Sequence, residues 1–368
     1  MVGLAAAAAI AVVTAFVEPG PTDPRATPTT HRAARTGLAD AAETVMGTLV
    51  GPPSPSFLAR VRNGKMGGVV LLRNGWLSRS TAARVTAELQ QAACTRGEPL
   101  LIAVDQEGGL VRRLFWAPPT EAPAYMSSAG DAAVQASGAA AALRSVGIDV
   151  DFAPVVDTPS STRSFLGSRA FSHSPSWNAA MARSFVGGLQ DNGIAATAKH
   201  FPGLGLASGN TDNGRIVIRS AAWKVRRGLT PFASAIRAGV KLVMVSTAVY
   251  TKLDRSDRPA AFSPPILSGI LRKQLGFKGV TVTDSLTAPA ADRIPHTATR
   301  AMLAGSDLLI FGAESASERA YATLIGDEAG SARLRARLAQ AAARIRALKA
   351  WLAAEGGPAC PAESLRAG

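Results

Sequence analysis

The stretch Ile194-Ala195-Ala196-Thr197-Ala198-Lys199-His200-Phe201-Pro202-Gly203 joins a short apolar run to a lysine and a histidine. A second apolar run, residues 279–283, leads in the same way to Asp284. Charged groups are costly to bury unless they pair or bind a ligand, so their position just after two buried strands needs a reason. The ends of parallel strands are where β/α barrels and open α/β sheets hold their active sites. We therefore expect Lys199, His200 and Asp284 to serve a function rather than only a structural ion pair.

Short apolar runs recur eight times along the 368-residue chain, at residues 45–50, 68–72, 100–104, 148–152, 194–198, 242–246, 280–283 and 308–311. Helix-like segments separate them, most clearly at residues 80–93, 132–145, 175–192 and 264–275. Eight non-alternating runs in roughly 300 residues predict an α/β fold of the (β/α)8 TIM-barrel type, with a doubly wound open sheet as the alternative. The first run and the helix after it are weakly marked, so we expect any irregularity of the barrel there.

A long C-terminal helix is predicted at residues 331–355. One stripe of it is apolar and holds Leu334, Leu338, Ile345, Leu348 and Leu352, while arginines occupy most of the rest. A basic amphipathic helix can lie on a membrane, but more often its stripe packs against its own domain, and we expect packing here. The chain then divides into an N-terminal part at 1–40, a barrel at 41–355 and a flexible tail at 356–368.

The N-terminal part indicates the localisation of the protein rather than its fold. Residues 2–17 are almost wholly apolar and resemble the hydrophobic region of a secretory signal, although a basic start is missing. The run is short for a membrane span, and the Pro/Thr/Arg-rich residues 19–30 follow it as a linker. We expect export by a cleaved signal or an uncleaved anchor, which makes the protein secreted or anchored at the outer face of the cell membrane.

Composition excludes several classes of function. The net charge is +14, but Lys and Arg are scattered and the 5% of aromatic residues do not interleave with them, so we expect no nucleic-acid partner. No dinucleotide glycine fingerprint, phosphate loop or metal-ligand spacing is present, and we expect no cofactor and no metal. The two cysteines, Cys94 and Cys360, either form one disulfide or remain separate thiols. We also expect the protein to be a monomer.

Polar side chains follow or end five of the predicted strands. They are Asp105, Asp151 with Asp157, Lys199 with His200, Thr247, and Asp284. In a barrel these strand ends converge on one mouth. Several carboxylates with basic groups suit a polyhydroxylated ligand, and they also suit glycoside hydrolysis, which needs one ionised carboxylate and one proton donor.

Four motifs resemble those of glycoside hydrolase family 3 in order and spacing, over about residues 45–315. They are Asp105-Gln106-Glu107-Gly108-Gly109, Asp151-Phe152-Ala153-Pro154-Val155-Val156-Asp157, Lys199-His200-Phe201-Pro202-Gly203, and Gly276-Phe277-x-Gly279-Val280-x-x-x-Asp284-x-Leu286. Within that family the chain is most similar to the single-domain bacterial β-N-acetylhexosaminidases. The resemblance implies a barrel that cleaves terminal β-linked N-acetylglucosamine, with cell-wall fragments as a source, or that has a β-glucosidase-like specificity.

The resemblance also implies roles for single residues. Asp284 matches the nucleophile that forms a covalent glycosyl-enzyme in a retaining mechanism. Asp105, Arg169, Lys199 and His200 match sugar-binding positions, with Arg169 inside Gly167-Ser168-Arg169-Ala170-Phe171. Because a nucleophile must be ionised, we expect basic neighbours such as Lys199 or Arg169 to favour the charged form of Asp284.

One loop departs from the pattern of the hexosaminidase branch. That branch carries an Asp-Ser-His element whose histidine is the acid/base, whereas Asn210 and Asp212 stand at the corresponding positions here. Either Asp212 is the proton donor, or the donor comes from elsewhere, or the protein is a catalytically weak or inactive sugar-binding homologue. An aspartate in such a Gly-rich loop is as often a turn residue as a catalytic one.

Overall fold

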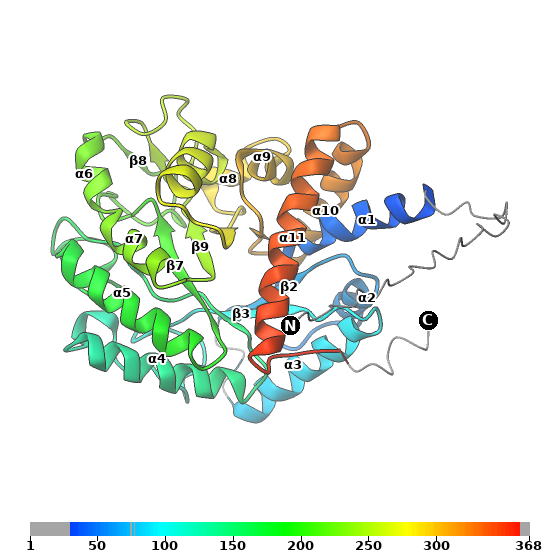
Figure 1. The fold of residues 1–368 in the computed structure, drawn as a ribbon, viewed down its shortest axis with the longest axis horizontal. Helices are drawn as coiled ribbons and strands as arrows, with labels where there is room; N and C mark the ends of the chain where they lie inside the picture. Colours follow the sequence, from blue (N-terminus) through cyan, green and yellow to red (C-terminus); the bar gives the residue numbers. More distant parts are fainter. Residues whose placement is uncertain (1–29, 74–75, 77, 361–368) are drawn as a thin grey trace, which may run out of the picture.

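The computed structural model describes residues 30–73, 76 and 78–360 (Figure 1). Its central sheet has eight strands: β1 (Val45–Leu49), β2 (Gly68–Leu71), β3 (Leu101–Val104), β6 (Val150–Asp151), β7 (Ala195–Phe201), β9 (Leu242–Val245), β11 (Val280–Thr283) and β12 (Leu309–Ile310). Neighbouring strands pair in parallel in the order β11-β9-β7-β6-β3-β2-β1-β12. A parallel bridge between Val282 and Leu308 brings the two ends together. The predicted (β/α)8 barrel is confirmed, and each of the eight apolar runs coincides with one strand, although β7 continues beyond its run to include Lys199 and His200.

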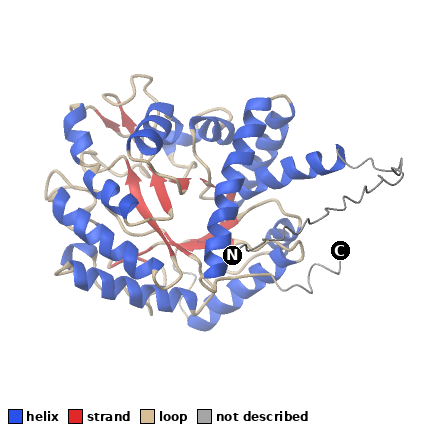
Figure 2. Cartoon of the chain, viewed as in Figure 1, coloured by secondary structure: helices blue, strands red, loops and turns tan. Residues whose placement is uncertain are grey.

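Helices surround the strands on the outside (Figure 2). One follows each strand: α2 (Pro55–Arg62), α3 (Arg79–Cys94), α4 (Ala129–Arg144), α5 (Pro175–Gln190), α7 (Thr230–Arg237), the π-helical η4 (Pro265–Gln274), α9 (Thr297–Ala304) and α10 (Glu314–Ala329). The side chain of a serine accepts the first free N–H groups of α2, α3, α4 and α5 at their starts. The first unit is regular despite its weak pattern, because Ser54 and Pro55 start α2 and β1 is buried on both faces.

The interior of the barrel is filled by alternate residues of the strands. Along β3, Leu101 and Ala103 belong to the interior cluster, whereas Ile102 and Val104 belong to the layer under the helices. This alternation is the period of two expected for a strand. Consequently a polar residue next to an inward-facing residue points away from the barrel axis.

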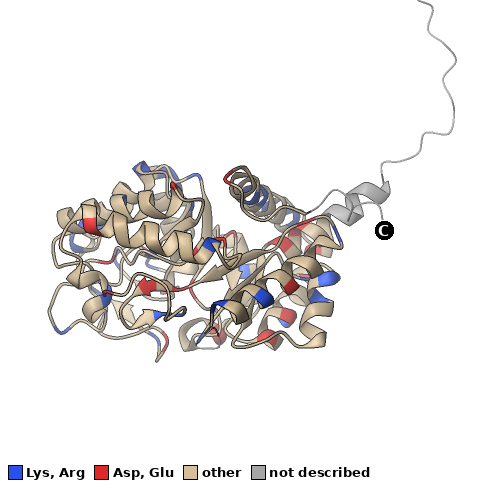
Figure 3. Cartoon of the chain, turned by 90° about the horizontal axis from the view of Figure 1, so that it is seen from below, with Lys and Arg blue, Asp and Glu red and all other residues tan. Residues whose placement is uncertain are grey.

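Helix α11 (Ala332–Ala354) covers the end of the barrel where the strands begin. Its residues Ile345, Leu348 and Leu352 are part of the interior cluster, so the predicted packing of the apolar stripe is confirmed. Ion pairs fix the helix: Arg337 and Arg344 reach the buried Asp307 at 2.6 and 2.8 Å. Much of the basic character of this helix is therefore used within the domain (Figure 3 shows Lys and Arg spread over many elements).

The cysteines are joined. Cys94 at the end of α3 and Cys360 beyond α11 form a disulfide across 266 residues, with their Cα atoms 5.2 Å apart. Residues 356–360 of the expected tail lead to this bond, while 361–368 lie outside the described residues. At the other end, α1 (Thr30–Glu43) begins within the expected N-terminal part, and the apolar residues 2–17 also lie outside the described residues. Among the residues that are described, no helix is long and apolar enough to cross a membrane.

Candidate active site

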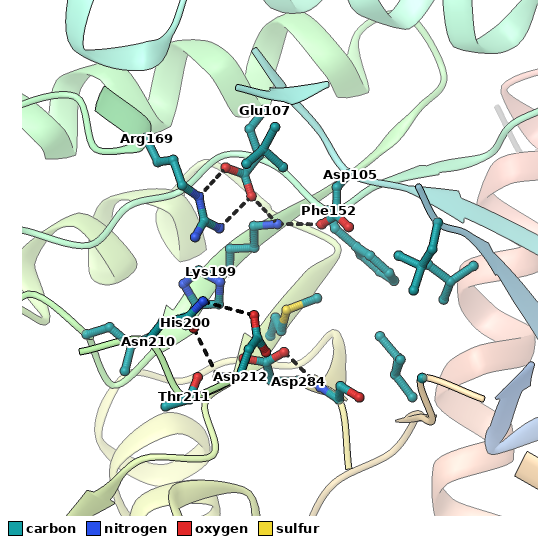
Figure 4. A pocket seen from close by; sticks show the side chains of 18 of the residues that line it. Asp105, Glu107, Phe152, Arg169, Lys199, His200, Asn210, Thr211, Asp212 and Asp284 are labelled. Atoms are coloured by element: carbon teal, nitrogen blue, oxygen red, sulfur yellow. Dashed lines mark hydrogen bonds and ion pairs between the residues drawn. The ribbon is translucent and has the colours of Figure 1, made fainter. Parts of the chain in front are cut away.

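A pocket of about 440 Å³ opens at the carboxyl ends of the strands (Figure 4). Its floor is apolar and consists of interior barrel residues, among them Val70, Phe152, Met244 and Ile310. Its walls include all six site residues expected from the sequence, Asp105, Arg169, Lys199, His200, Asp212 and Asp284. The fold thus brings together side chains that are up to 179 positions apart, from Asp105 to Asp284.

Lys199 stands at the centre of an ion-pair network on one wall. It projects from β7, is 2% exposed, and places Nζ 2.7 Å from Oδ1 of Asp105 and 2.6 Å from Oε1 of Glu107. Burial by itself would lower the pKa of Lys199, but the two carboxylates outweigh burial and raise it. The ammonium group therefore stays charged and holds both carboxylates in place.

Glu107 lies in the Asp105–Gly109 motif, but the sequence alone predicts no role for it. It is fully buried, and besides Lys199 it binds the Nε and an Nη atom of Arg169, both at 2.8 Å. Burial opposes ionisation, yet Lys199 and Arg169 lower the pKa of Glu107 to about 2. Such a bidentate pair fixes the plane of the guanidinium group, which then lies at the pocket wall.

Arg113 is a further lining residue that the sequence analysis missed. It follows the hairpin of β4 (Gln106–Gly108) and β5 (Val111–Arg112), and its guanidinium lies 3.7 Å from Oδ2 of Asp105. The hairpin turns at Gly108 with φ +103, and a Cβ there would come 2.2 Å from the carbonyl oxygen of Glu121. Only glycine permits that turn. A turn motif directly after Asp105 was the available signal that later residues fold back beside it.

His200 is held by a buried carboxylate. Its Nδ1 donates to Oδ2 of Asp157 at 2.8 Å, and its backbone N–H donates to the same oxygen at 3.2 Å. The other oxygen of Asp157 accepts the backbone N–H of Leu204 at 2.7 Å. Asp157 does not line the pocket, so it positions His200 and the start of the following loop rather than contacting a ligand.

Asp284 lies at the end of β11 and is partly exposed in the pocket. The backbone N–H of Ser285 donates to its Oδ1 at 2.8 Å. Burial and the neighbouring Asp212 raise the pKa of Asp284, while His200 and Lys199 oppose them without reversing the direction. Lys199 thus favours the charged form of Asp284, as expected, but burial outweighs it, and Arg169 does not contribute because it is paired with Glu107.

Asp212 reaches the same pocket from the loop after β7. It is exposed, Nδ2 of Asn210 donates to its Oδ2 at 3.1 Å, and its own N–H donates to Oδ1 of Asn210 at 3.0 Å. Figure 4 shows Asp212 and Asp284 directed toward the same space. The reciprocal bonds with Asn210 make a local turn, and they also orient the carboxylate toward the pocket.

Besides Asp157, two of the expected strand-end groups do not line the pocket. Asp151 and Thr247 are fully buried and do not line the pocket. Val150 and Phe152 point into the barrel, so Asp151 between them must point outward, where it accepts the N–H of Gln106 at 3.0 Å. Within residues 30–73, 76 and 78–360, no group of three or more His, Cys, Asp or Glu side chains is arranged to hold a metal ion.

Comparisons with known proteins agree with this geometry. The sequence model of the Glycosyl hydrolase family 3 N terminal domain matches residues 52–348. The β-hexosaminidase of Methylococcus capsulatus is 34% identical over 259 residues, covering 66% of this chain and 75% of that protein. That of Bordetella avium is 36% identical over 267 residues, covering 68% and 75%.

Solved structures give the same result. A family 3 β-N-acetylglucosaminidase from Paenibacillus sp. superposes with a TM-score of 0.81 at 30% identity, over 88% of this chain and 64% of that one. A β-N-acetylhexosaminidase from Beutenbergia cavernae has a TM-score of 0.74 at 30% identity, over 87% and 98%. The barrel, the pocket at its carboxyl end and these matches lead to one conclusion: the chain belongs to glycoside hydrolase family 3 and is a glycoside hydrolase.

Proposed function

We propose that this enzyme removes terminal β-linked N-acetylglucosamine with retention of configuration, through a covalent intermediate on Asp284. The observation that carries the proposal is that Asp284 and Asp212 share one pocket whose floor is closed by barrel side chains. A pocket with a closed floor suits the end of a sugar chain, and retaining cleavage uses one carboxylate as nucleophile and a second carboxyl group as proton donor. The relatives described as β-N-acetylglucosaminidases support the choice of sugar.

The first step uses Asp284 as nucleophile. Its carboxylate attacks the anomeric carbon, the bond from that carbon to the leaving oxygen breaks, and the leaving oxygen takes a proton. In the second step water attacks the same carbon, loses a proton to the group that first gave one, and releases Asp284. We assign this proton transfer to Asp212, because Asp105 and Glu107 are held in ion pairs with Lys199 and Arg169, whereas Asp212 faces the same space as Asp284 (Figure 4).

The ion-pair network on the opposite side supplies sugar binding. Asp105 presents acceptors, whereas Arg169 and Lys199 present donors, and all three are already fixed by charge-assisted bonds. Because little side-chain freedom is lost on binding, their binding energy can hold the ring in a reactive geometry. His200, fixed by Asp157, completes this set beside the nucleophile.

The test is turnover of a chromogenic β-N-acetylglucosaminide, with the corresponding β-glucoside as the specificity control. We expect the glucosaminide to be preferred, Asp284→Ala to abolish turnover with the fold intact, and the first product seen by NMR to be the β-anomer. Preference for the glucoside would contradict the proposed specificity for N-acetylglucosamine. An α-anomer as first product would exclude retention of configuration. Near-normal activity of a folded Asp284→Ala protein would remove Asp284 from the mechanism.

We also propose that the protein works outside the cytoplasm. The apolar residues 2–17 resemble a secretory signal, and the Cys94–Cys360 disulfide is a bond that oxidising compartments favour. Cell-wall fragments would then be an accessible substrate. Fusing residues 1–40 to a reporter that is active only after export tests this, and an inactive, cytoplasmic reporter would contradict it.

A further inference from the structure

A second cavity, of about 420 Å³, lies beside the active-site pocket. We call it the α6 pocket, because helix α6 (Ala222–Arg227) forms one of its walls. The segment after β7 separates the two cavities: Leu204 lines the active-site pocket, whereas Gly203 and Gly205 line the α6 pocket. The two cavities have no lining residue in common, so the α6 pocket is not an extension of the catalytic site.

The charge of the α6 pocket has one sign. Lys224 and Arg227 line it, and its lining contains no Asp or Glu. Neither Lys224 nor Arg227 forms an ion pair with any residue that the structure describes. Their neighbour Arg226 differs, because it points away and binds Oε1 of Gln274 at 3.0 Å. Unpaired cations around a concave surface favour an anionic ligand.

An aromatic face stands next to these cations. Trp223 is 63% exposed, and Nζ of Lys224 lies 5.6 Å from the centroid of its ring. An indole that is both exposed and at the rim of a cavity is typical of a contact surface, since Trp is enriched where binding energy is concentrated. A flat apolar face with a cation beside it matches a pyranose ring that carries an acidic substituent.

Hydrogen-bonding groups complete the pocket. Nδ1 of His173 lies 3.0 Å from the carbonyl oxygen of Pro159, and because a carbonyl only accepts, Nδ1 must carry the proton. Nε2 is then left as an acceptor for a ligand hydroxyl. Ser160 and Ser220 also line the pocket, and neither side chain forms a hydrogen bond within the described part of the chain.

We propose that the α6 pocket is a second, non-catalytic binding site for an oligosaccharide that carries carboxylates. Trp223 packs on the ring face, Lys224 and Arg227 bind the carboxylate, and His173 with the serines binds hydroxyls. The choice of a carbohydrate rather than another anion rests on the proposed function. The occupant would be a remote part of a glycan chain, or a second chain, held close to the pocket that cleaves chain ends.

The test is calorimetric titration in the Asp284→Ala background, which prevents cleavage of the ligand. Two tetrasaccharides are compared: chitotetraose, which is uncharged, and an alternating N-acetylglucosamine–N-acetylmuramic acid chain, which has the same backbone with added carboxylates. We expect one equivalent of chitotetraose and two of the acidic chain. The affinity for the second equivalent should fall as ionic strength rises, because exposed charge pairs are screened by salt.

Trp223→Ala and Lys224→Ala/Arg227→Ala should each reduce the affinity of the second equivalent by roughly tenfold or more. The matched controls are Arg226→Ala, on the same helix, and Trp177→Ala, an exposed tryptophan outside the pocket lining. Both should bind like the background. A single equivalent of the acidic chain, or unchanged binding by both pocket variants, would overturn the proposal.

Hydrolysis of a small chromogenic glycoside separates this outcome from failure of the proposed function. Trp223→Ala with Asp284 intact should hydrolyse it like the parent, because Trp223 does not line the active-site pocket. If the parent itself hydrolyses no N-acetylglucosaminide, the proposed function fails. Binding of the acidic chain at two sites is then still decided by the titration alone.

Discussion

Asp157 binds both the side chain and the backbone of His200 with one carboxylate oxygen, at 2.8 and 3.2 Å, and its other oxygen holds the N–H of Leu204. One buried carboxylate thus fixes a pocket residue and the first turn of the loop that carries Asp212. Asp157→Asn cannot satisfy all three donors, and the loss of charge-assisted bonds costs about 1.5–3 kcal/mol.

We expect Asp157→Asn to lower kcat/KM for the N-acetylglucosaminide by roughly tenfold to hundredfold, in proportion to that free energy. Far-UV circular dichroism checks that the variant is folded. The control is Asp191→Asn, at the exposed end of α5, which should have parental activity. Parental kcat/KM for Asp157→Asn would show that the orientation of His200 does not matter.

The pH dependence of kcat/KM should reflect the raised pKa of Asp284. The nucleophile must be ionised, so activity is lost as the pH falls through this pKa, and the acid limb should lie above the ordinary value of 3.8. Because the charge of Asp212 is one cause of the increase, Asp212→Asn should move the limb to lower pH. A limb at or below 3.8, or a shift to higher pH in Asp212→Asn, would contradict the assignment.

The role of Asp212 as proton donor predicts a dependence on the leaving group. Asp212→Ala should slow glycosides with poor leaving groups far more than activated aryl glycosides, because only the former need protonation to depart. Added azide should restore deglycosylation by replacing the water that the missing base would activate. The control is Asn210→Ala, which disturbs the turn but leaves the carboxylate. Equal loss on both substrates, without an azide effect, would mean that Asp212 only shapes the loop.

Glu107→Gln tests the network that positions the sugar-binding cations. Lys199 and Arg169 each lose a buried charged partner, which should destabilise the protein by roughly 3 kcal/mol and weaken sugar binding. The loss should be largest above pH 4.5 and shrink as the pH falls toward 2, because parental Glu107 becomes protonated there. Chemical denaturation at several pH values measures this.

The control for Glu107→Gln is Glu88→Gln. Glu88 pairs with Arg84 at 3.7 Å on the exposed surface of α3, and its replacement should change stability by less than about 1 kcal/mol. If the two variants are equally stable, the buried network contributes nothing to the fold.

The buried carboxyl group of Asp149 predicts a pH dependence of stability that is opposite in sign to that of Glu107. Burial raises its pKa to about 8 from 3.8, although its Oδ2 accepts the N–H of Ile102 at 3.0 Å. The folded state therefore keeps a proton that the unfolded chain releases, and stability falls as the pH rises from about 4 to 8. Asp149→Asn should remove this loss and gain up to about 1.4 kcal/mol per pH unit over the parent in that range. If the difference in stability between Asp149→Asn and the parent is the same at pH 4 and pH 8, the raised pKa of Asp149 is contradicted.

Most strands could be predicted because they are buried on both faces and contain a short apolar run, so the pattern does not depend on partners far along the chain. The site residues at strand ends could be predicted for the same reason. The direction of the Asp151 side chain could not be predicted, because it depends on which residues of β6 face into the barrel. Glu107 and Arg113 needed the hairpin register, and the Cys94–Cys360 pairing needed a contact across 266 residues.

Helix α11 has a consequence for where this domain ends. A chain cut after α10 would still contain the eight strands of the central sheet and the helix that follows each, yet Leu101, Leu242 and Val280 would lose Ile345, Leu348 and Leu352 from their cluster. Even the family match stops at 348, inside this helix and before Leu352 and the disulfide. A fragment produced in isolation should therefore extend to Cys360, and one that ends before α11 would expose the apolar base of the barrel to water as a surface for aggregation.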